Sequence, residues 1–462
     1  MKYLFIFPSI GFYLSRYIRG ASAFLPPLGV LYLARMVELH GHSAEIIDYN
    51  AEKFEDNAFE RAVKSADVVG LTIYSDQKEF ENSITLTKKI KQISPDMPII
   101  IGGPHCTLFP EQTLISHNAD ICVKGEGELI IGPITDALEG KRELSSIPGL
   151  TYLQNGKIHT TKPNEQIENL DVIPFPARHL VEKYEYGHML GMKTMKGKAT
   201  SLISSRGCPN RCTFCQLTCF SEYRRRSVTN TTQEIDELVN AGYNSIAFAD
   251  DNFLADKKRV EQIMDHILKQ RYDLSFWIID ARVDSADRKL YQKLRDAGVE
   301  LISFGIESGN QEILDYYNKK ITLQQVRNAI KLSKEMGFMI DANFILGAPN
   351  ETKKQINNTI KFAKSLDIDH AVFNHFEYTA GSSIWKQAVS EGKLSPEETS
   401  VKSCKKRDLA LYTSEEIDKL CNKANFSFYT NPMYWIRQFN FALRNNNPTI
   451  IRLALRKIKN II

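Results

Sequence analysis

The sequence predicts an α/β chain in which an N-terminal doubly wound parallel sheet of Rossmann-like type is followed by a partial (β/α)6 barrel of TIM type and a C-terminal helical region. Two observations predict this fold class. Short aliphatic and β-branched runs alternate with amphipathic stretches to about residue 140, and again from about residue 196, and this alternation is typical of parallel sheets. The chain has 462 residues, which is enough for two or three domains.

The first part, residues 1–140, is expected to form the doubly wound sheet. Its strands are predicted at Tyr3–Phe7, Glu45–Asp48, Val68–Tyr74, Pro98–Ile101 and Ile121–Val123, and its helices at Gly29–His40, Glu79–Ile93 and Glu128–Leu138. Ligands of such sheets bind at the carboxyl ends of the strands. Gly102 with Gly103, and Gly125 with Gly127, lie at two of these ends. They either let the backbone approach a ligand closely or form plain turns.

Residues 141–195 are interpreted as a connector, because they contain hairpin signals and a proline-rich crossing. Residues 196–385 are expected to form the barrel, whose reactive groups gather at the carboxyl ends of its strands. The strands are predicted at Thr200–Ser204, Ser245–Ala249, Ser275–Ile279, Leu301–Gly305, Met339–Leu346 and Ala371–Glu377. The residues that follow the second to fifth strands are Asp250, Asp251, Arg282, Asp284, Glu307, Ser308 and Gly347. For the three aspartates, a helix N-cap is the alternative role.

One loop carries the most specific pattern in the chain. Cys208, Cys212 and Cys215 have the spacing Cys-x3-Cys-x2-Cys. Three thiolates leave one iron of a four-iron cluster open to a small molecule. A structural zinc site, with Cys219 as the nearby extra ligand, and unrelated thiols are the alternatives. The other four cysteines follow no paired pattern, which fits a reduced, cytoplasmic protein.

The cysteine loop resembles the signature of the radical S-adenosylmethionine (SAM) enzymes. This resemblance implies that SAM chelates the open iron of a 4Fe–4S cluster and is split to a 5′-deoxyadenosyl radical. Together with the glycine motifs ahead of it, the loop resembles the cobalamin-dependent group of that family over about residues 1–385. The resemblance implies that Thr72, Gly102, Gly103 and Gly125 contact cobalamin. The loop after the first strand has no histidine, so we expect no protein imidazole on cobalt, and we interpret His42 and His105 as surface or tail contacts.

SAM presents an ammonium, a carboxylate, a ribose and an adenine. Asp250 or Asp251 can accept hydrogen bonds from the ammonium, and the planar fork of Arg282 can pair with the carboxylate. The segment around Glu307 and Ser308 resembles the ribose motif of the family. The segment around Gly347 resembles its adenine-binding strand.

The resemblance implies methylation of an unactivated carbon through the radical and methylcobalamin. The alternative is radical ring closure or rearrangement of a tetrapyrrole or lipid, and a non-enzymatic alternative is an iron–sulfur electron carrier or sensor. A methylthiotransferase would carry further ordered cysteines and a terminal β-barrel, which are not evident. We expect a small-molecule or lipid substrate and an electron donor such as flavodoxin or ferredoxin.

The C-terminal region, residues 386–462, ends in a basic segment. Residues 421–462 contain seven Lys and Arg residues and no Asp or Glu. Ile451, Leu455, Ile458 and Ile462 repeat at helical spacing, which predicts an amphipathic helix. This helix either docks on the barrel or makes a peripheral contact with an anionic membrane. The other basic run, Arg224-Arg225-Arg226 after the cysteine loop, is too short to indicate nucleic-acid binding and has no RNA-binding module beside it, so no nucleic-acid partner is expected.

Overall fold

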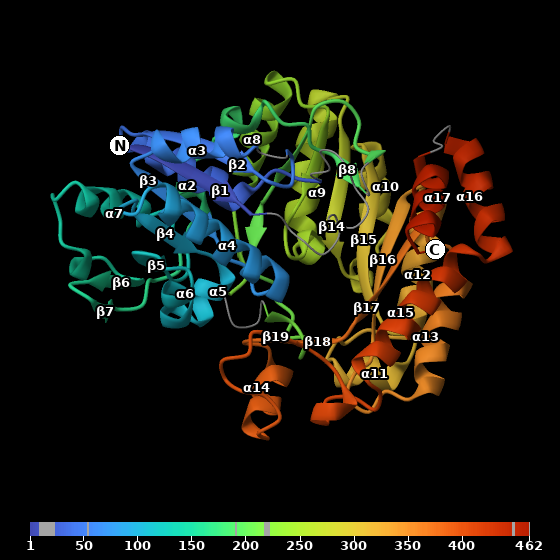
Figure 1. The fold of residues 1–462 in the computed structure, drawn as a ribbon. Helices are drawn as coiled ribbons and strands as arrows, with labels where there is room; N and C mark the ends of the chain where they lie inside the picture. Colours follow the sequence, from blue (N-terminus) through green and yellow to red (C-terminus); the bar gives the residue numbers. More distant parts are fainter. Residues whose placement is uncertain (9–23, 53–54, 190–191, 217–221, 446–448, 462) are drawn as a thin grey trace. The chain divides into compact units, whose positions relative to one another are not determined.

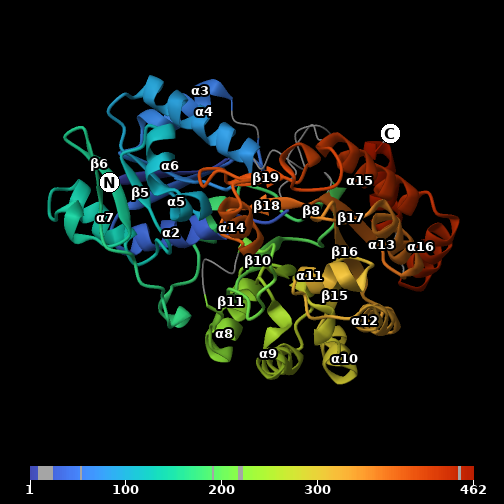
Figure 2. The same ribbon diagram turned by 90° about the horizontal axis from the view of Figure 1, so that it is seen from below.

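The computed structural model describes residues 1–8, 24–52, 55–189, 192–216, 222–445 and 449–461 (Figure 1). The chain divides into two compact units, Met1–Gly191 and Met192–Ile462. Figure 2 shows the same two units from below. The finer division into four parts stays a prediction.

The first unit is built on one seven-stranded sheet, which confirms the doubly wound fold. Five strands are parallel in the order β2-β1-β3-β4-β5, and two antiparallel strands extend the edge beyond β5. The strands are β1 (Lys2–Phe7), β2 (Ser43–Asp48), β3 (Val68–Thr72), β4 (Ile99–Gly102), β5 (Ile121–Val123), β6 (Leu150–Gln154) and β7 (Lys157–Thr160). The hairpin predicted in the connector is therefore the β6–β7 edge of this sheet.

Helices cover both faces of the first sheet because successive side chains of a strand point to opposite faces. The Tyr3 hydroxyl pairs with Thr135 Oγ1 at 2.7 Å, whereas Leu4 and Ile6 pack in a cluster with Phe59. The helices are α2 (Leu28–Leu39), α3 (Asp56–Lys64), α4 (Gln77–Ile93), α5 (Pro104–Leu108), α6 (Pro110–Ser116) and α7 (Ile131–Leu138). Helices α3, α5 and α6 are not among those that the sequence pattern predicts. The last two are short and begin at a proline, whose fixed φ suits a first helical position.

The connector beyond this hairpin also belongs to the first unit as far as that unit extends, whereas residues 192–195 belong to the second unit. Tyr186 donates a hydrogen bond to Asp48 Oδ2 at 3.0 Å, and Tyr184 donates to the carbonyl of Ile46 at 3.3 Å. Burial raises the pKa of Asp48. The segment that contains Tyr184 and Tyr186 is thus fixed to the carboxyl half of β2.

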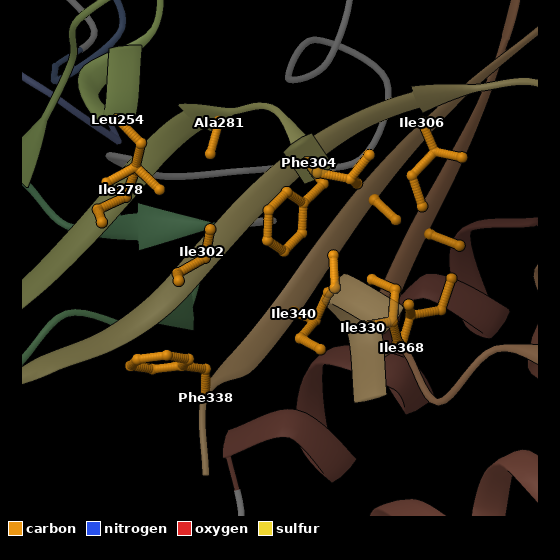
Figure 3. Close-up of a cluster of buried hydrophobic side chains, with 14 of the residues drawn as sticks. Leu254, Ile278, Ala281, Ile302, Phe304, Ile306, Ile330, Phe338, Ile340 and Ile368 are labelled. Carbon is orange, nitrogen blue, oxygen red and sulfur yellow. The ribbon is translucent and has the colours of Figure 1, made fainter. Parts of the chain in front are cut away.

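Six parallel strands form the second unit, in the order expected for a partial barrel: β10-β13-β14-β15-β16-β17. They are β10 (Ala199–Leu202), β13 (Ser245–Phe248), β14 (Ser275–Ala281), β15 (Val299–Glu307), β16 (Met339–Leu346) and β17 (His370–His375). The helices of these units are α8 (Val228–Asn240), α9 (Lys257–Gln270), α10 (Arg288–Asp296), α11 (Gln311–Tyr316), α12 (Leu323–Glu335) and α13 (Lys353–Ser365). Figure 3 shows part of the core between strands and helices, where Ile278, Ile302, Phe304 and Ile340 are buried.

Short elements complete the second unit. The strands β11 (Ser205–Arg206) and β12 (Arg224–Arg225) pair on either side of the cysteine loop. The strands β18 (Glu377–Thr379) and β19 (Ser400–Lys402) pair around α14 (Ser383–Ser390). Both pairs are antiparallel.

The first of three C-terminal helices docks on β17, the edge strand of the second sheet, and the other two pack on the first and on each other. They are α15 (Ser414–Tyr429), α16 (Pro432–Asn445) and α17 (Thr449–Ile461). The Tyr429 hydroxyl bonds both the N–H and the carbonyl of Ala371, at 3.0 Å each. Tyr434 donates to the carbonyl of Asp369 at 2.9 Å. These hydroxyls satisfy backbone groups that an uncovered edge strand would expose.

The apolar stripe predicted on the last helix is only partly present. Ala454 and Ile458 pack against the core of the second unit, whereas Leu455 is 56% exposed. Ile462 lies outside the described residues. Ala454 faces the core of the second unit. Leu455 therefore points away from it, because adjacent helical residues are about 100° apart. Among the described helices, none is both long enough and apolar enough to span a bilayer.

Candidate functional site

The three cysteines lie in the loop between β11 and β12, after the first barrel strand. Cys212 is buried, Cys208 and Cys215 are partly exposed, and all three are free thiols. The loop is fixed from both sides, because the Gly207 N–H donates to Asp251 Oδ2 at 2.8 Å and the Thr213 N–H donates to the carbonyl of Tyr317 at 2.9 Å. Cys219 lies outside the described residues. No three His, Cys, Asp or Glu side chains among the described residues converge as ligands of one metal ion.

The adjacent acids Asp250 and Asp251 have different surroundings. Asp250 is 1% exposed and accepts hydrogen bonds from the hydroxyls of Ser204 and Ser205, at 2.7 and 2.5 Å. Burial raises its pKa. Asp251 is partly exposed beside the cysteine loop. Asp250 thus fixes the backbone after β10, while Asp251 remains the candidate contact for the SAM ammonium.

The N-cap alternative for the three aspartates is wrong. Helix α9 is capped by Asp256, which accepts from the Arg259 N–H, and α10 is capped by Asp287. Asp284 instead binds the guanidinium of Arg282.

Arg282 connects three parts of the site. Its Nη2 donates to Asp284 Oδ2 at 2.8 Å and to the carbonyl of Lys319 at 2.6 Å. Its Nη1 lies 4.0 Å from Cys212 Sγ. The side chain is 8% exposed. The guanidinium predicted to bind the SAM carboxylate is therefore held by Asp284 and Lys319 beside Cys212.

Glu307, at the end of β15, forms a buried ion pair with Lys319. Lys319 Nζ lies 2.7 Å from Glu307 Oε1, and each side chain is 8% exposed. Burial lowers the pKa of Lys319, but the charges of Glu307 and Cys212 outweigh it and raise that pKa overall. Glu307 has a φ of 69°, beside an irregularity in the β15–β16 register. Sequence reasoning missed Lys319, because no local pattern distinguishes it from a surface lysine.

Ser308 and Gly347 serve the packing of the barrel rim. The Ser308 hydroxyl is buried and lies 3.2 Å from Thr359 Oγ1 on α13. Gly347 has a φ of +89°, and a Cβ there would lie 2.8 Å from Ile417 on α15. The N–H groups of Gly347 and Ala348 both donate to Glu351 Oε2, at 2.7 and 3.2 Å. The loop expected to face adenine is thus shaped by a buried carboxylate that sequence reasoning did not single out.

Asp280, on β14, is a further acid that sequence reasoning missed. Its side chain is open to solvent, yet surrounding protein raises its pKa to about 7, with further contributions from Asp251 and Glu307. The sequence could have indicated Asp280, because it lies two residues before Arg282, at the end of a barrel strand.

A polar row crosses the inner side of the same sheet. Ser303, Asp341 and His370 are register partners on β15, β16 and β17. Ser303 donates to Asp341 Oδ2 at 2.8 Å, and His370 Nδ1 lies 2.5 Å from Asp341 Oδ1. The buried His370 Nε2 has no hydrogen-bond partner among the described residues. Such a nitrogen can bond a ligand.

In the first unit, the predicted cobalamin contacts gather at the ends of neighbouring strands. Thr72 and Gly102 are register partners on β3 and β4. Gly103 has a φ of +104°, and a Cβ there would lie 2.8 Å from Thr72 Oγ1. The Gly125 N–H, after β5, donates to Thr107 Oγ1 at 3.0 Å, and a Cβ on Gly125 would meet open space.

His105 is not the surface or tail contact that we expected. It is 1% exposed, its Nδ1 bonds Thr113 Oγ1 at 2.6 Å, and its ring stacks on Phe80 at 4.2 Å. Burial lowers its pKa to about 4, with a smaller contribution from His117. His105 is therefore a core histidine. The loop after β1 lies, from residue 9, outside the described residues.

Comparisons with known proteins assign this arrangement to a family. The profile of the Radical SAM superfamily matches residues 202–363, and the profile of the B12 binding domain matches residues 17–132. A protein named as an uncharacterized methyltransferase of Pyrococcus horikoshii is 34% identical, over 99% of this chain and 97% of its own length. The chain belongs to the cobalamin-dependent radical SAM enzymes.

Two further similarities agree with this family. The anaerobic magnesium-protoporphyrin IX monomethyl ester cyclase of Rubrivivax gelatinosus is 28% identical over 80% of this chain and 67% of the cyclase. The radical SAM methyltransferase TsrM of Kitasatospora setae, solved with cobalamin and a 4Fe–4S cluster, superimposes with a TM-score of 0.66. It is 16% identical and covers 84% of this chain and 75% of TsrM, which shows the fold.

Family membership confirms the expected cofactors of this cobalamin-dependent radical SAM enzyme: a 4Fe–4S cluster, SAM and cobalamin. The residues present fit them. Three free thiols share one loop, beside two cations and a partly exposed acid. The first unit supplies glycine backbone at strand ends. The chain is an enzyme whose similarities support methyl transfer as its leading reaction.

Proposed function

We propose that this cobalamin-dependent radical SAM enzyme methylates an unactivated carbon of a small molecule, and that the residues around the cysteine loop hold SAM for this reaction. The observation that carries the proposal is the contact between Arg282 Nη1 and Cys212 Sγ, because it puts a fixed cation beside the cysteine loop. When bound, the cluster with SAM supplies a carbon radical, and cobalamin supplies a methyl group.

Cys208, Cys212 and Cys215 would hold the cluster. Asp251 would accept hydrogen bonds from the SAM ammonium, and Arg282 would pair with its carboxylate through the Nη1 that faces Cys212. Asp250 would act at a distance, by fixing Ser204 and Ser205 ahead of the loop.

Glu307 and the loop at Gly347 would position the rest of SAM. The second oxygen of the Glu307 carboxylate would bond the ribose hydroxyls, while Lys319 holds the first. The backbone after β16, shaped by Glu351, would lie along the adenine. Ser308 would support this geometry through its contact with Thr359.

Asp280 and the polar row are suited to contact the substrate. The Asp280 carboxyl is open to solvent and has a pKa of about 7, so it can hold or release a proton near neutral pH. His370 Nε2 offers a further hydrogen-bonding position on the same inner wall. These groups favour a substrate with hydroxyl, amine or carbonyl groups near the carbon that reacts.

Radical ring closure is the second candidate reaction. The observation that favours it is the similarity to the Rubrivivax gelatinosus cyclase over 80% of this chain. A tetrapyrrole or lipid would then be the substrate. In either reaction, a reduced flavodoxin or ferredoxin would deliver the electron to the cluster.

The decisive experiment follows the methyl group. The enzyme is purified without oxygen, its cofactors are reconstituted, and it is incubated with methyl-labelled SAM and a cell extract. Methylation predicts an extract compound that gains the labelled methyl group while deoxyadenosine forms. A product that loses hydrogen without gaining label would identify ring closure instead.

The cysteine variants test whether the same loop holds the cluster. Replacing Cys208, Cys212 or Cys215 with Ala should abolish both the cluster absorbance and the formation of deoxyadenosine. Cys219→Ala is the matched control and should retain both. If Cys219→Ala alone lost the cluster, the ligand set would have to be reassigned.

A further inference from the structure

A row of large apolar side chains points outward from α16. Its members are Met433, Ile436, Phe439 and Leu443, and each is between 54% and 66% exposed. Successive helical residues are about 100° apart, so the four lie within about 120° of arc. We call this set the α16 stripe. Contiguous exposed apolar residues of this size mark a surface that contacts another partner.

The opposite side of α16 is occupied by the core of the second unit. Tyr434 and Gln438 are fully buried, and the Tyr434 hydroxyl is fixed to the carbonyl of Asp369. The Trp435 indole N–H donates to the carbonyl of Tyr429 at 2.7 Å. The helix is therefore held in one orientation, and the α16 stripe cannot turn inward without breaking these contacts.

The surroundings of the α16 stripe are basic. Residues 421–462 contain seven Lys and Arg residues without one Asp or Glu. Lys423, Arg452 and Lys459 are exposed. On α17, which packs against α16, Leu455 adds a further exposed apolar side chain at 56%. Asp367, from outside this segment, lies 3.8 Å from Arg437 on α16. An apolar helix face in a segment rich in Lys and Arg and free of Asp and Glu has the composition of a helix that lies in a membrane interface.

We propose that α16 and α17 (red in Figures 1 and 2) form a docking surface for an anionic lipid bilayer, with the α16 stripe inserted at the boundary between headgroups and acyl chains. An anionic bilayer is complementary to both the apolar row and the basic residues, because it has an apolar interior and a negatively charged surface. A second copy of the chain matches only the first, because it would bring two acid-free basic segments together. This surface is independent of the reaction that the barrel performs.

The test is flotation of the full-length holoenzyme with vesicles. We expect it to float with phosphatidylcholine vesicles that contain phosphatidylglycerol at low salt, and to remain unbound with pure phosphatidylcholine or at high salt. Replacing Met433, Ile436, Phe439 and Leu443 together with Gln should abolish flotation. Gln has a helix propensity close to that of Leu and Met, so α16 should persist.

Two further variants separate apolar from charge effects. The matched control carries Leu39→Gln and Ile115→Gln, which remove side chains that are 58% and 66% exposed in the first unit, and it should float like the wild type. Arg452→Gln with Lys459→Gln should weaken binding to the anionic vesicles roughly fivefold for each lost cation. Circular dichroism of each variant reports whether the fold is kept.

Three outcomes would overturn the proposal. The wild type could fail to float with anionic vesicles at low salt. The four-residue variant, folded, could float as the wild type does. Sedimentation could show a dimer that the four-residue variant loses, which would assign the α16 stripe to self-association.

Discussion

At the scale of single residues, the charged side chains of the candidate site form ion pairs within the protein itself. Lys319 and Glu307 are buried together, and Arg282 is held by Asp284 while it faces Cys212. Burial raises the pKa of Cys212, and the charges of Lys319 and Arg282 oppose this rise because an opposite charge stabilises an ionised group. The same pairing means that Glu307 cannot be changed without affecting Lys319.

The first prediction concerns this buried pair. Glu307→Gln leaves the Lys319 ammonium buried without an anion, which should lower the free energy of unfolding by about 3–5 kcal/mol. It should also weaken SAM binding by about 1–3 kcal/mol, the scale of a charged hydrogen bond. Urea unfolding and SAM titration measure the two effects.

Lys319→Met is the companion variant. Together with Glu307→Gln and the variant that carries both changes, it completes a double-mutant cycle. The double variant should recover much of the lost stability, since neither charge is then left alone. If its loss of unfolding free energy equalled the sum of the losses in the two single variants, the two side chains would not act as a pair. Unchanged SAM affinity in folded Glu307→Gln would assign the ribose contact to another residue.

At the scale of elements, side chains bond the backbone groups at the ends and edges of helices and strands, in most cases from nearby in the chain and in one case from far away. Three helices of the second unit begin with the same local capping box, in which a Thr and a Gln or Glu three residues later bond each other's backbone. The loop after β16 is different, since Glu351 closes it from inside the protein. The edge of β17 is closed by Tyr429, 58 residues from Ala371.

The second prediction concerns the pH dependence that Glu351 gives to stability. Burial raises its pKa from 4.5 to about 7. Between these pH values the folded chain holds a proton that the unfolded chain has lost, so the free energy of unfolding should fall as pH rises through this window. The fall is on the order of 3 kcal/mol and should end near pH 7.

Glu351→Gln should make this dependence shallower by the share that Glu351 contributes, because the amide does not titrate while its oxygen still accepts the Gly347 N–H. Urea unfolding at about pH 5 and about pH 8 compares the variant with the wild type. Asp280→Asn is the comparison variant: its carboxyl also has a pKa of about 7, so it should remove a separate share of the dependence while leaving the Gly347 loop intact, and the two shares should add in the double variant. An unchanged slope in Glu351→Gln would contradict the raised pKa.

The third prediction concerns the edge of β17. Tyr429→Phe removes the hydroxyl that bonds both backbone groups of Ala371, and it should destabilise the chain by about 1–3 kcal/mol because those groups stay buried. Tyr412→Phe is the matched control, since its hydroxyl accepts from the exposed Lys353 N–H and water can replace it. If Tyr429→Phe and Tyr412→Phe lowered the melting temperature equally, the contact of Tyr429 with Ala371 would have no special role in stability.

At the scale of the whole molecule, each unit has its own sheet, core and ligand-facing strand ends. The first unit gathers Thr72, Gly102, Gly103 and Gly125 at three neighbouring strand ends, and the second gathers the cysteine loop with the barrel acids. Their cofactors should therefore bind separately.

The fourth prediction follows from this separation. The chain with Cys208, Cys212 and Cys215 replaced by Ala should lose the cluster yet bind cobalamin like the wild type. The cob(II)alamin form should show no nitrogen splitting from the protein in electron paramagnetic resonance, because His105 is held in the core. Splitting that vanished in His42→Ala or His105→Ala would contradict this coordination.

Patterns between neighbouring residues were enough to predict part of this molecule. The alternation of strands with helices is a local pattern, and it predicted both sheets correctly; the cysteine spacing is local too, and it predicts the loop that holds the cluster. Tertiary structure alone decided which of Asp250 and Asp251 is buried, since the partners of Asp250 lie 46 and 45 residues away. It also decided that Lys319 pairs with Glu307, that His105 lies in the core, and that α17 turns Leu455 outward. In each case the physical reason is the same: burial and charge depend on residues that only folding brings together.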